Sequence, residues 1–77
     1  MLSKRQSHIV DILSNEMRPV TGKDLGKALG VSDRTIRSDV EAINREYGCE
    51  LIRASRRSGY FVDNELMKAQ NISSQEV

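Results

Sequence analysis

Two short segments of the sequence are rich in arginine, a side chain well suited to contacting nucleic acid. Arg34, Arg37 and Arg45 recur along a stretch with helical spacing, and Arg56 and Arg57 stand together in a predicted turn. A guanidinium group can hold guanine through a bidentate contact to O6 and N7, and it can also bind a phosphate. The two segments together predict contacts to DNA, although each alone is also compatible with an ordinary solvated surface.

The stretch from residue 33 to residue 47 is predicted to be a helix with one apolar and one polar face. Successive helical residues are turned by about 100°, so Ile36, Val40, Ile43 and Tyr47 fall within about 40° of one line. This stripe is expected to face a core. The opposite face is polar and would be free to contact a partner. Its residues are Arg34, Ser38, Glu41 and Arg45, flanked by Thr35 and Arg37.

Residues that could support catalysis or hold a metal are few and scattered. The chain has one histidine, His8, and one cysteine, Cys49, and one cysteine can form neither an internal disulfide nor a zinc site. We expect His8 on the surface and Cys49 buried at the start of a strand. There is no nucleophile–base pair and no phosphate-binding loop in the sequence. The sequence therefore predicts no enzyme activity, no metal and no cofactor.

Length and composition indicate one small domain with an aliphatic core. Of the 77 residues, 38% are hydrophobic, 30% charged and 4% aromatic, and so short a chain has no room for a deep pocket. Residues 1–60 hold 11 Lys and Arg against 8 Asp and Glu (+3), whereas residues 61–77 hold 1 against 3 (−2). No apolar run approaches the ~18 residues of a membrane span and no signal core follows the N-terminus, so we expect a cytoplasmic protein without membrane contact.

Two helices are predicted ahead of the arginine-bearing one. The first begins at Ser3 and covers residues 3–16, and its apolar face holds Leu2, Ile9, Val10, Ile12, Leu13 and Met17. The second covers residues 22–29. Thr21 caps it, Asp24 completes an approximate capping box, and Val20 and Leu25 form a hydrophobic staple. It is expected to present Leu25, Ala28 and Leu29 to the core, with Gly26 where another helix approaches closely.

The short connection between the second and third helices identifies their arrangement. Gly30 is predicted to end the second helix in a left-handed conformation, Ser32 to cap the third and Gly48 to end it. Two helices joined by so short a turn leave each other at a steep angle. This is the layout of a helix-turn-helix, whose second helix enters the major groove of DNA.

A β-hairpin is predicted after the third helix. Residues 50–55 form its first strand, residues 56–59 its turn and residues 60–62 its return strand. The tip "SRRSG" could rest on the phosphate backbone or reach a minor groove. A short helix at residues 65–69 and a linker at residues 71–75 complete the prediction. The predicted DNA-contacting residues are Ser32, Arg34, Thr35, Arg37, Ser38, Glu41, Arg45, Arg56 and Arg57.

Two stretches, "VTGKDLGKALGVSDRTIRSDVEAIN" and "SRRSGYFV", resemble the biotin-repressor-type winged helix-turn-helix of bacterial transcription regulators. The residues that match that family's pattern are Gly26, Gly30, Val31, Ser32, Thr35, Ile36, Arg37, Asp39, Val40, Gly59 and Tyr60. The chain departs from the pattern at Gly26, where alanine is commoner, and at Asp33, where a basic or small residue is usual. The resemblance implies sequence-specific binding to double-stranded DNA, usually as a homodimer, with a separate effector domain following.

The sequence thus predicts an α+β fold, a three-helix winged helix-turn-helix with a C-terminal two-stranded β-hairpin. Residues 1–62 would form the DNA-binding domain, and residues 63–77 would form a tail, or a linker to a missing effector domain. Helix 33–47 would lie in the major groove and the wing, residues 55–60, on the backbone. The alternative is a winged-helix module that binds protein without binding DNA. Such modules lose the arginines that this chain keeps.

Overall fold

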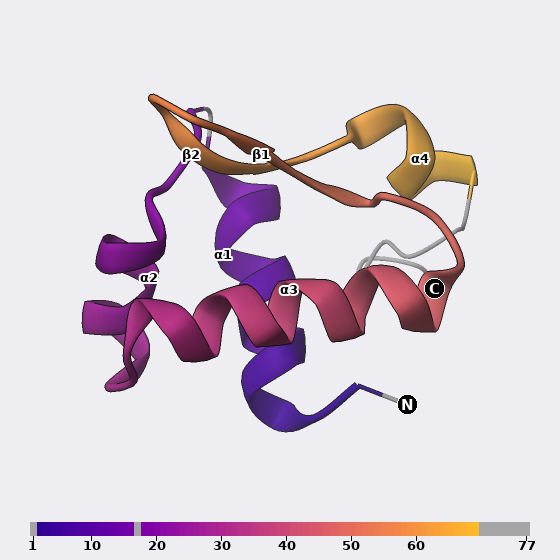
Figure 1. Ribbon diagram of the computed structural model, residues 1–77. Coiled ribbons are helices and arrows are strands. Elements are labelled where there is room, and N and C mark those ends of the chain that lie inside the picture. Colours follow the sequence, from indigo (N-terminus) through magenta and orange to yellow (C-terminus); the bar gives the residue numbers. More distant parts are fainter. Residues whose placement is uncertain (1, 17, 70–77) are drawn as a thin grey trace.

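A computed structural model describes residues 2–16 and 18–69 of the 77-residue chain. Three helices come first, then a hairpin, then a short fourth helix (Figure 1). The elements are α1 (Lys4–Asn15), α2 (Gly22–Leu29), α3 (Asp33–Tyr47), β1 (Ile52–Ser55), β2 (Gly59–Val62) and α4 (Asn64–Ala69). In Figure 1, α1 crosses behind α3 at a steep angle and the hairpin lies over one end of α1. The predicted α+β winged helix-turn-helix is confirmed.

Capping residues set the ends of α2 and α3 as predicted, and Ser3, predicted as the first residue of the first helix, is the N-cap of α1. The Ser3, Thr21 and Ser32 hydroxyls each accept a hydrogen bond from the backbone N–H three residues later, which satisfies an otherwise unpaired donor. Ser3 takes part in a full capping box with Gln6, which was not predicted. Gly30 and Gly48 end α2 and α3 in the left-handed conformation, with φ values of 74° and 68°, where glycine carries no steric penalty.

Two expectations about α2 were wrong in detail. Leu25 is buried and Leu29 partly buried, but Ala28 is exposed and so does not contribute to the core. Gly26 does allow a close approach, but to the turn and not to the body of another helix. A Cβ atom there would overlap the carbonyl oxygen of Val31, whose own N–H donates to the Gly26 carbonyl at 2.9 Å. Gly26 thus permits the tight turn into α3.

The hairpin is antiparallel and begins two residues later than predicted. Ile52 pairs with Val62 at the end of β2, and just before it the Leu51 carbonyl accepts a hydrogen bond from the Asp63 N–H at 2.9 Å. The Asn44 side chain on α3 binds Ile52 on its other edge, accepting from its N–H at 2.9 Å and donating to its carbonyl at 3.0 Å. The Asn44 amide thus makes the two hydrogen bonds that a neighbouring strand would make, and it fixes β1 to α3. Gly59, placed in the turn by the prediction, opens β2 with φ 108°.

The hairpin is also fastened, near its loop end, to the segment before α2. Val20 and Tyr60 form an isolated antiparallel bridge, with N–H to carbonyl distances of 2.8 and 2.7 Å. A Cβ atom on Gly59 would lie 2.5 Å from the Val20 oxygen, so only glycine permits this contact. The hairpin is therefore held at a fixed angle to the start of α2.

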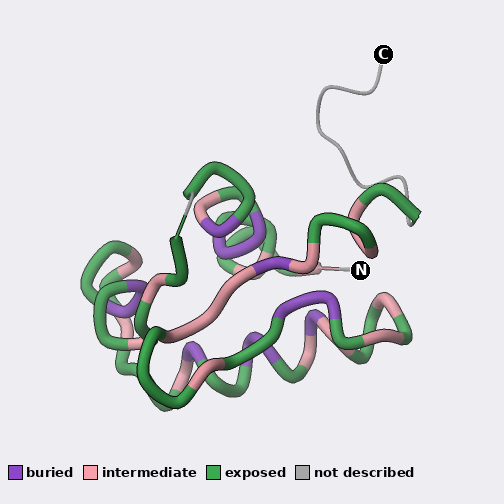
Figure 2. The backbone as a smooth tube through the Cα atoms, turned by 90° about the horizontal axis from the view of Figure 1, so that it is seen from above, coloured by how far each residue is buried: buried purple, intermediate pink, exposed green. Residues whose placement is uncertain are grey.

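The core is aliphatic, as predicted. Its buried members come from α1, α2, α3, the hairpin and the residue before it, and they are Ile9, Val10, Leu13, Leu25, Ile36, Val40, Ile43, Leu51, Ile52 and Val62. Figure 2 shows the buried segments facing the middle of the molecule. Cys49 is only partly buried, because it lies in the loop ahead of Leu51, so its predicted full burial was wrong. His8 is exposed, as expected. The predicted face of the first helix is confirmed except at Met17, which lies outside the described residues.

Helix α4 follows the hairpin directly and begins one residue earlier than predicted. The Asp63 carboxylate accepts hydrogen bonds from the N–H groups of Glu65 and Leu66 at 3.0 and 3.2 Å, and its other oxygen lies 3.4 Å from Arg53. The predicted linker, residues 71–75, lies outside the described residues. Across the part of the chain that is described, every helix is too short or too polar to cross a membrane.

Candidate nucleic-acid interface

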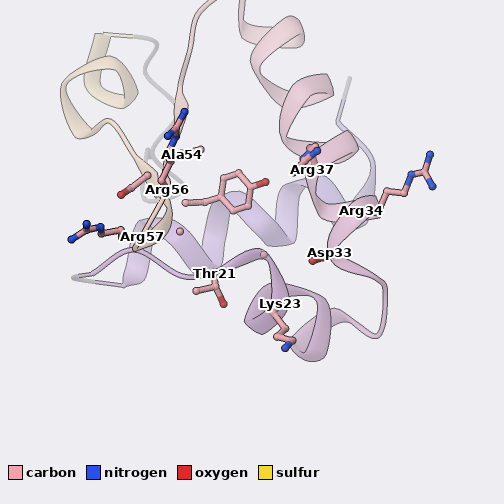
Figure 3. A pocket seen from close by; sticks show the side chains of 12 residues that line it. Thr21, Lys23, Asp33, Arg34, Arg37, Ala54, Arg56 and Arg57 are labelled. Atoms are coloured by element: carbon pink, nitrogen blue, oxygen red, sulfur yellow. The ribbon is translucent and has the colours of Figure 1, made fainter.

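An open groove of about 820 Å³ lies between the start of α2, the first turns of α3 and the hairpin (Figure 3). Three separate parts of the sequence meet there because the Val20–Tyr60 bridge holds the hairpin beside α2. The lining residues are Thr21, Gly22, Lys23, Asp33, Arg34, Arg37, Ala54, Ser55, Arg56, Arg57, Gly59 and Tyr60. Five of these carry positive side chains and one carries a negative side chain, so the groove is suited to a polyanion.

The structure brings together four of the predicted arginines. Arg34 and Arg37 line one side of the groove from α3, and Arg56 and Arg57 line the other side from the hairpin loop. All four are exposed, and none of their side chains makes a hydrogen bond or ion pair with a described residue. In Figure 3, Arg34 extends outward from α3. Their charges are therefore available to an external ligand.

Ser32 and Thr35 stand at the start of α3 and hold each other in place. The Ser32 hydroxyl accepts from the Thr35 N–H at 3.2 Å and donates to the Thr35 hydroxyl oxygen at 3.1 Å. Neither residue lines the groove. Their observed role is to fix the first turn of α3, which carries Arg34 and then Arg37.

Three further predicted residues lie on α3 outside the groove. Ser38, Glu41 and Arg45 are all exposed, but none of them lines it, and Arg45 belongs to the last turn of the helix. They share the outer face of α3, as the helical spacing predicted. Their contact with DNA stays a prediction.

The sequence reasoning missed the contribution of α2. Thr21, Gly22 and Lys23 line the groove at the N-terminus of this helix, and the Lys23 side chain is exposed. Lys23 adds a fifth positive charge to those of the arginines, and backbone N–H groups at a helix start also favour anions. The available signal was a lysine in the first turn of a capped helix, but only the folded arrangement shows which way it faces.

A second missed contact holds α3 against α1. Asp39 is buried, with 4% of its surface exposed. Its carboxylate accepts from Arg5 Nε at 2.5 Å, from Arg5 Nη2 at 3.2 Å and from Gln6 Nε2 at 3.2 Å. The hydrogen bond from Arg5 holds the pKa of Asp39 below its usual value, against the opposing effect of burial, and Gln6 adds to the lowering. The same contact raises the pKa of Arg5.

This partly buried pair lies outside the groove and fixes α3 to α1. Asp39 belongs to the buried face of α3 together with Ile36, Val40 and Ile43, and Arg5 reaches it from the first turn of α1. The pair therefore sets the position of α3 and does not itself contact a ligand in the groove. Among the residues that the structure describes, no group of three His, Cys, Asp or Glu side chains could hold a metal ion.

Comparison with known families agrees with this geometry. The family model described as "HTH domain" matches residues 5–61 of the chain, a range that includes all of α2 and α3, nearly all of α1 and most of the hairpin. No curated protein and no solved structure matches the chain.

Proposed function

Since the chain belongs to the HTH domain family, a family of DNA-binding domains, we propose that it binds double-stranded DNA in a sequence-specific way as the DNA-binding domain of a bacterial transcription regulator. Within that family we propose the biotin-repressor type of winged helix. The observation that supports this proposal best is the groove between α3 and the hairpin. Four unpaired arginines and Lys23 line it, and they come from three elements.

In the proposed complex, α3 (residues 33–47) lies in the major groove. That groove is about 12 Å wide and admits one helix, and the outer face of α3 is exposed along its length. Arg34 and Arg37 would contact base edges, because residues at the start of a recognition helix reach furthest into the groove. Ser32, Thr35, Ser38, Glu41 and Arg45 would be further contacts from α3.

The hairpin and the start of α2 would contact phosphates on either side of α3. Arg56 and Arg57 occupy the exposed tip of the wing, residues 55–60, and Lys23 lies at the first turn of α2. Contacts of this kind give affinity and fix the register of the protein on the duplex, but they carry no base information. The fixed angle of the hairpin means that both phosphate-binding elements would be in place before DNA arrives.

We further propose that residues 1–62 act as the DNA-binding unit and residues 63–77 as a tail or linker to an effector domain. The full-length protein would then be a cytoplasmic homodimer on two half-sites related by a two-fold axis. Support comes from the resemblance described above, in which an effector domain follows a domain of this kind. A footprint of the full-length protein on one asymmetric site, without a symmetric partner site, would overturn the dimer.

The proposed DNA binding is tested by titrating a fluorescent duplex with the chain at several salt concentrations. Each neutralised phosphate contributes about −0.9 to the slope of log K against log salt, and four to six such contacts give a slope of roughly −4 to −5. Arg18→Ala serves as a control, because Arg18 is exposed but lies outside the groove. Absence of binding, or affinity independent of salt, would contradict the proposal and favour a protein-binding module.

A further inference from the structure

Asp33 is the one acidic side chain among the described residues that line the groove. It is exposed at the first position of α3, directly before Arg34. Figure 3 places it between the two arginines of α3 and Lys23 of α2. Its carboxylate makes no hydrogen bond or ion pair with any described residue. A charged acceptor is therefore presented toward whatever fills the groove.

The local structure of α3 does not require this carboxylate. Ser32 supplies the cap of the helix and binds the Thr35 N–H, so Asp33 has no capping bond to make. An acidic residue in the first turn does interact favourably with the helix dipole, but Asp24 in the first turn of α2 has the same advantage from outside the groove. Near phosphates, the Asp33 charge would be repulsive. A stabilising role alone thus leaves its place in the groove unexplained.

The chemistry of base edges offers a function for an unpaired carboxylate at this place. An ionised carboxylate only accepts hydrogen bonds. In the major groove, cytosine presents its N4 amino group as a donor, whereas adenine presents its amino group beside the acceptor N7 and guanine presents the acceptors N7 and O6. Cytosine is therefore the base that a lone carboxylate can contact without facing an acceptor.

We propose that Asp33 is a specificity-determining residue, which accepts a hydrogen bond from the N4 amino group of a cytosine in the major groove. This inference rests on the proposed DNA binding. Arg34 is the next residue on α3, and its guanidinium prefers guanine. The preferred half-site then contains a cytosine read by Asp33 close to a guanine read by Arg34. The same carboxylate disfavours any register that places a phosphate at that point.

The test is a selection from a pool of randomised duplexes by the 77-residue chain and by three variants. Asp33→Asn keeps the shape of the side chain, but its amide can donate a hydrogen bond to adenine N7 and accept one from adenine N6. Asp33→Ala removes the contact. Asp24→Asn is the matched control. Affinities for the selected duplex and for a scrambled one are then measured, together with the Tm of each variant. The Tm separates a role in base reading from a role in helix stability.

The proposal predicts that the wild-type chain and Asp24→Asn select the same motif, with cytosine at one fixed position. Asp33→Asn shifts that position toward adenine and Asp33→Ala makes it indifferent, and either change weakens binding to the original duplex by about fivefold or more. Affinity for the scrambled duplex rises by about twofold, because a negative charge near phosphates is gone.

An unchanged motif in both Asp33 variants would overturn the proposal, whether or not their Tm falls. A fall in affinity for selected and scrambled duplexes alike would overturn it too. If the wild-type chain selects no motif but still binds duplexes, the reading of cytosine is excluded while DNA binding stands. If it binds no duplex at all, the proposed function itself fails.

Discussion

At the scale of single residues, the arginines of the groove divide into two groups by the rigidity of the element that carries them. Arg34 and Arg37 project from the first turns of a helix that is capped by Ser32 and fixed to α1 by Asp39. Arg56 and Arg57 lie in the three-residue loop between β1 and β2. Reading a base needs a fixed position, whereas a phosphate can be contacted from a range of positions.

Replacing Arg34 or Arg37 by Ala is expected to cost about 1–3 kcal/mol of binding free energy on the selected duplex and to relax base preference at one or two positions. Replacing Arg56 or Arg57 should weaken binding to matched and scrambled duplexes alike and make the salt slope shallower by about one unit. Affinities of the four variants on both duplexes at two salt concentrations separate these outcomes, with Arg18→Ala as the control. If the loop variants lose preference and the helix variants lose affinity uniformly, the roles are reversed.

The candidate arginines could be identified from the sequence because side-chain chemistry and helical spacing are local properties. Lys23 and Asp33 could not be recognised as parts of one groove. They lie close together only because the turn at Val31 sets α3 at a particular angle to α2. In the sequence, Asp33 stood out as a departure from a family pattern and as an acidic residue at the start of the third helix. Exposure alone does not distinguish a DNA-contacting role for Ser38, Glu41 and Arg45, since the residues of an ordinary solvated helix face are equally exposed.

At the scale of elements, α3 is held from three directions, and only one of these could be predicted. Its apolar stripe packs on the core, as its periodicity indicated. Asn44 fastens it to β1, and Asp39 fastens it to Arg5 across 34 positions of sequence. Helix ends were predictable because a cap involves neighbouring residues. The start of β1, the Val20–Tyr60 bridge and the Arg5 contact depend on residues far apart in the chain, for which a single sequence gives no signal.

The contact between α1 and α3 leads to a prediction for Asp39→Asn. We expect this change to lower the free energy of unfolding by about 1–2 kcal/mol, since a buried carboxylate loses charge-assisted hydrogen bonds. The effect stays below that of a fully buried pair because 43% of the Arg5 side chain is exposed to solvent. Urea unfolding at neutral pH measures the loss. Asp11→Asn, at an exposed carboxylate of α1, is the control.

The same pair makes stability depend on pH in a definite direction. The pKa of Asp39 in the folded chain is lowered from the value of about 3.9 in an unfolded chain. Its contribution is therefore complete above that unfolded value and is lost as the pH falls through the lowered folded value. The free energy of unfolding of the wild-type chain and of Asp11→Asn should fall more steeply below about pH 4 than that of Asp39→Asn. Parallel curves for all three would exclude the pair as a source of acid sensitivity.

At the scale of the whole molecule, the described residues form a body of 32 × 24 × 21 Å. Its positively charged groove is lined by the start of α2, the first turns of α3 and the hairpin. Helix α3 has 15 residues, which corresponds to a length of about 22 Å, so it can extend along a major groove while the hairpin and the start of α2 lie over the backbones. Helix α4 has six residues and is too short to support a dimer on its own. In the homodimer proposed above, the interface is therefore expected to involve more than α4.

The groove is proposed as the surface that contacts DNA, and amide chemical-shift mapping tests this assignment most directly. The ¹⁵N-labelled chain is titrated with the duplex that it selects, and the shift of each backbone amide is followed. We expect the largest changes at residues 21–23, 32–41 and 56–59, with small changes along α1. Changes that cluster instead on α1 would contradict the assignment of the interface.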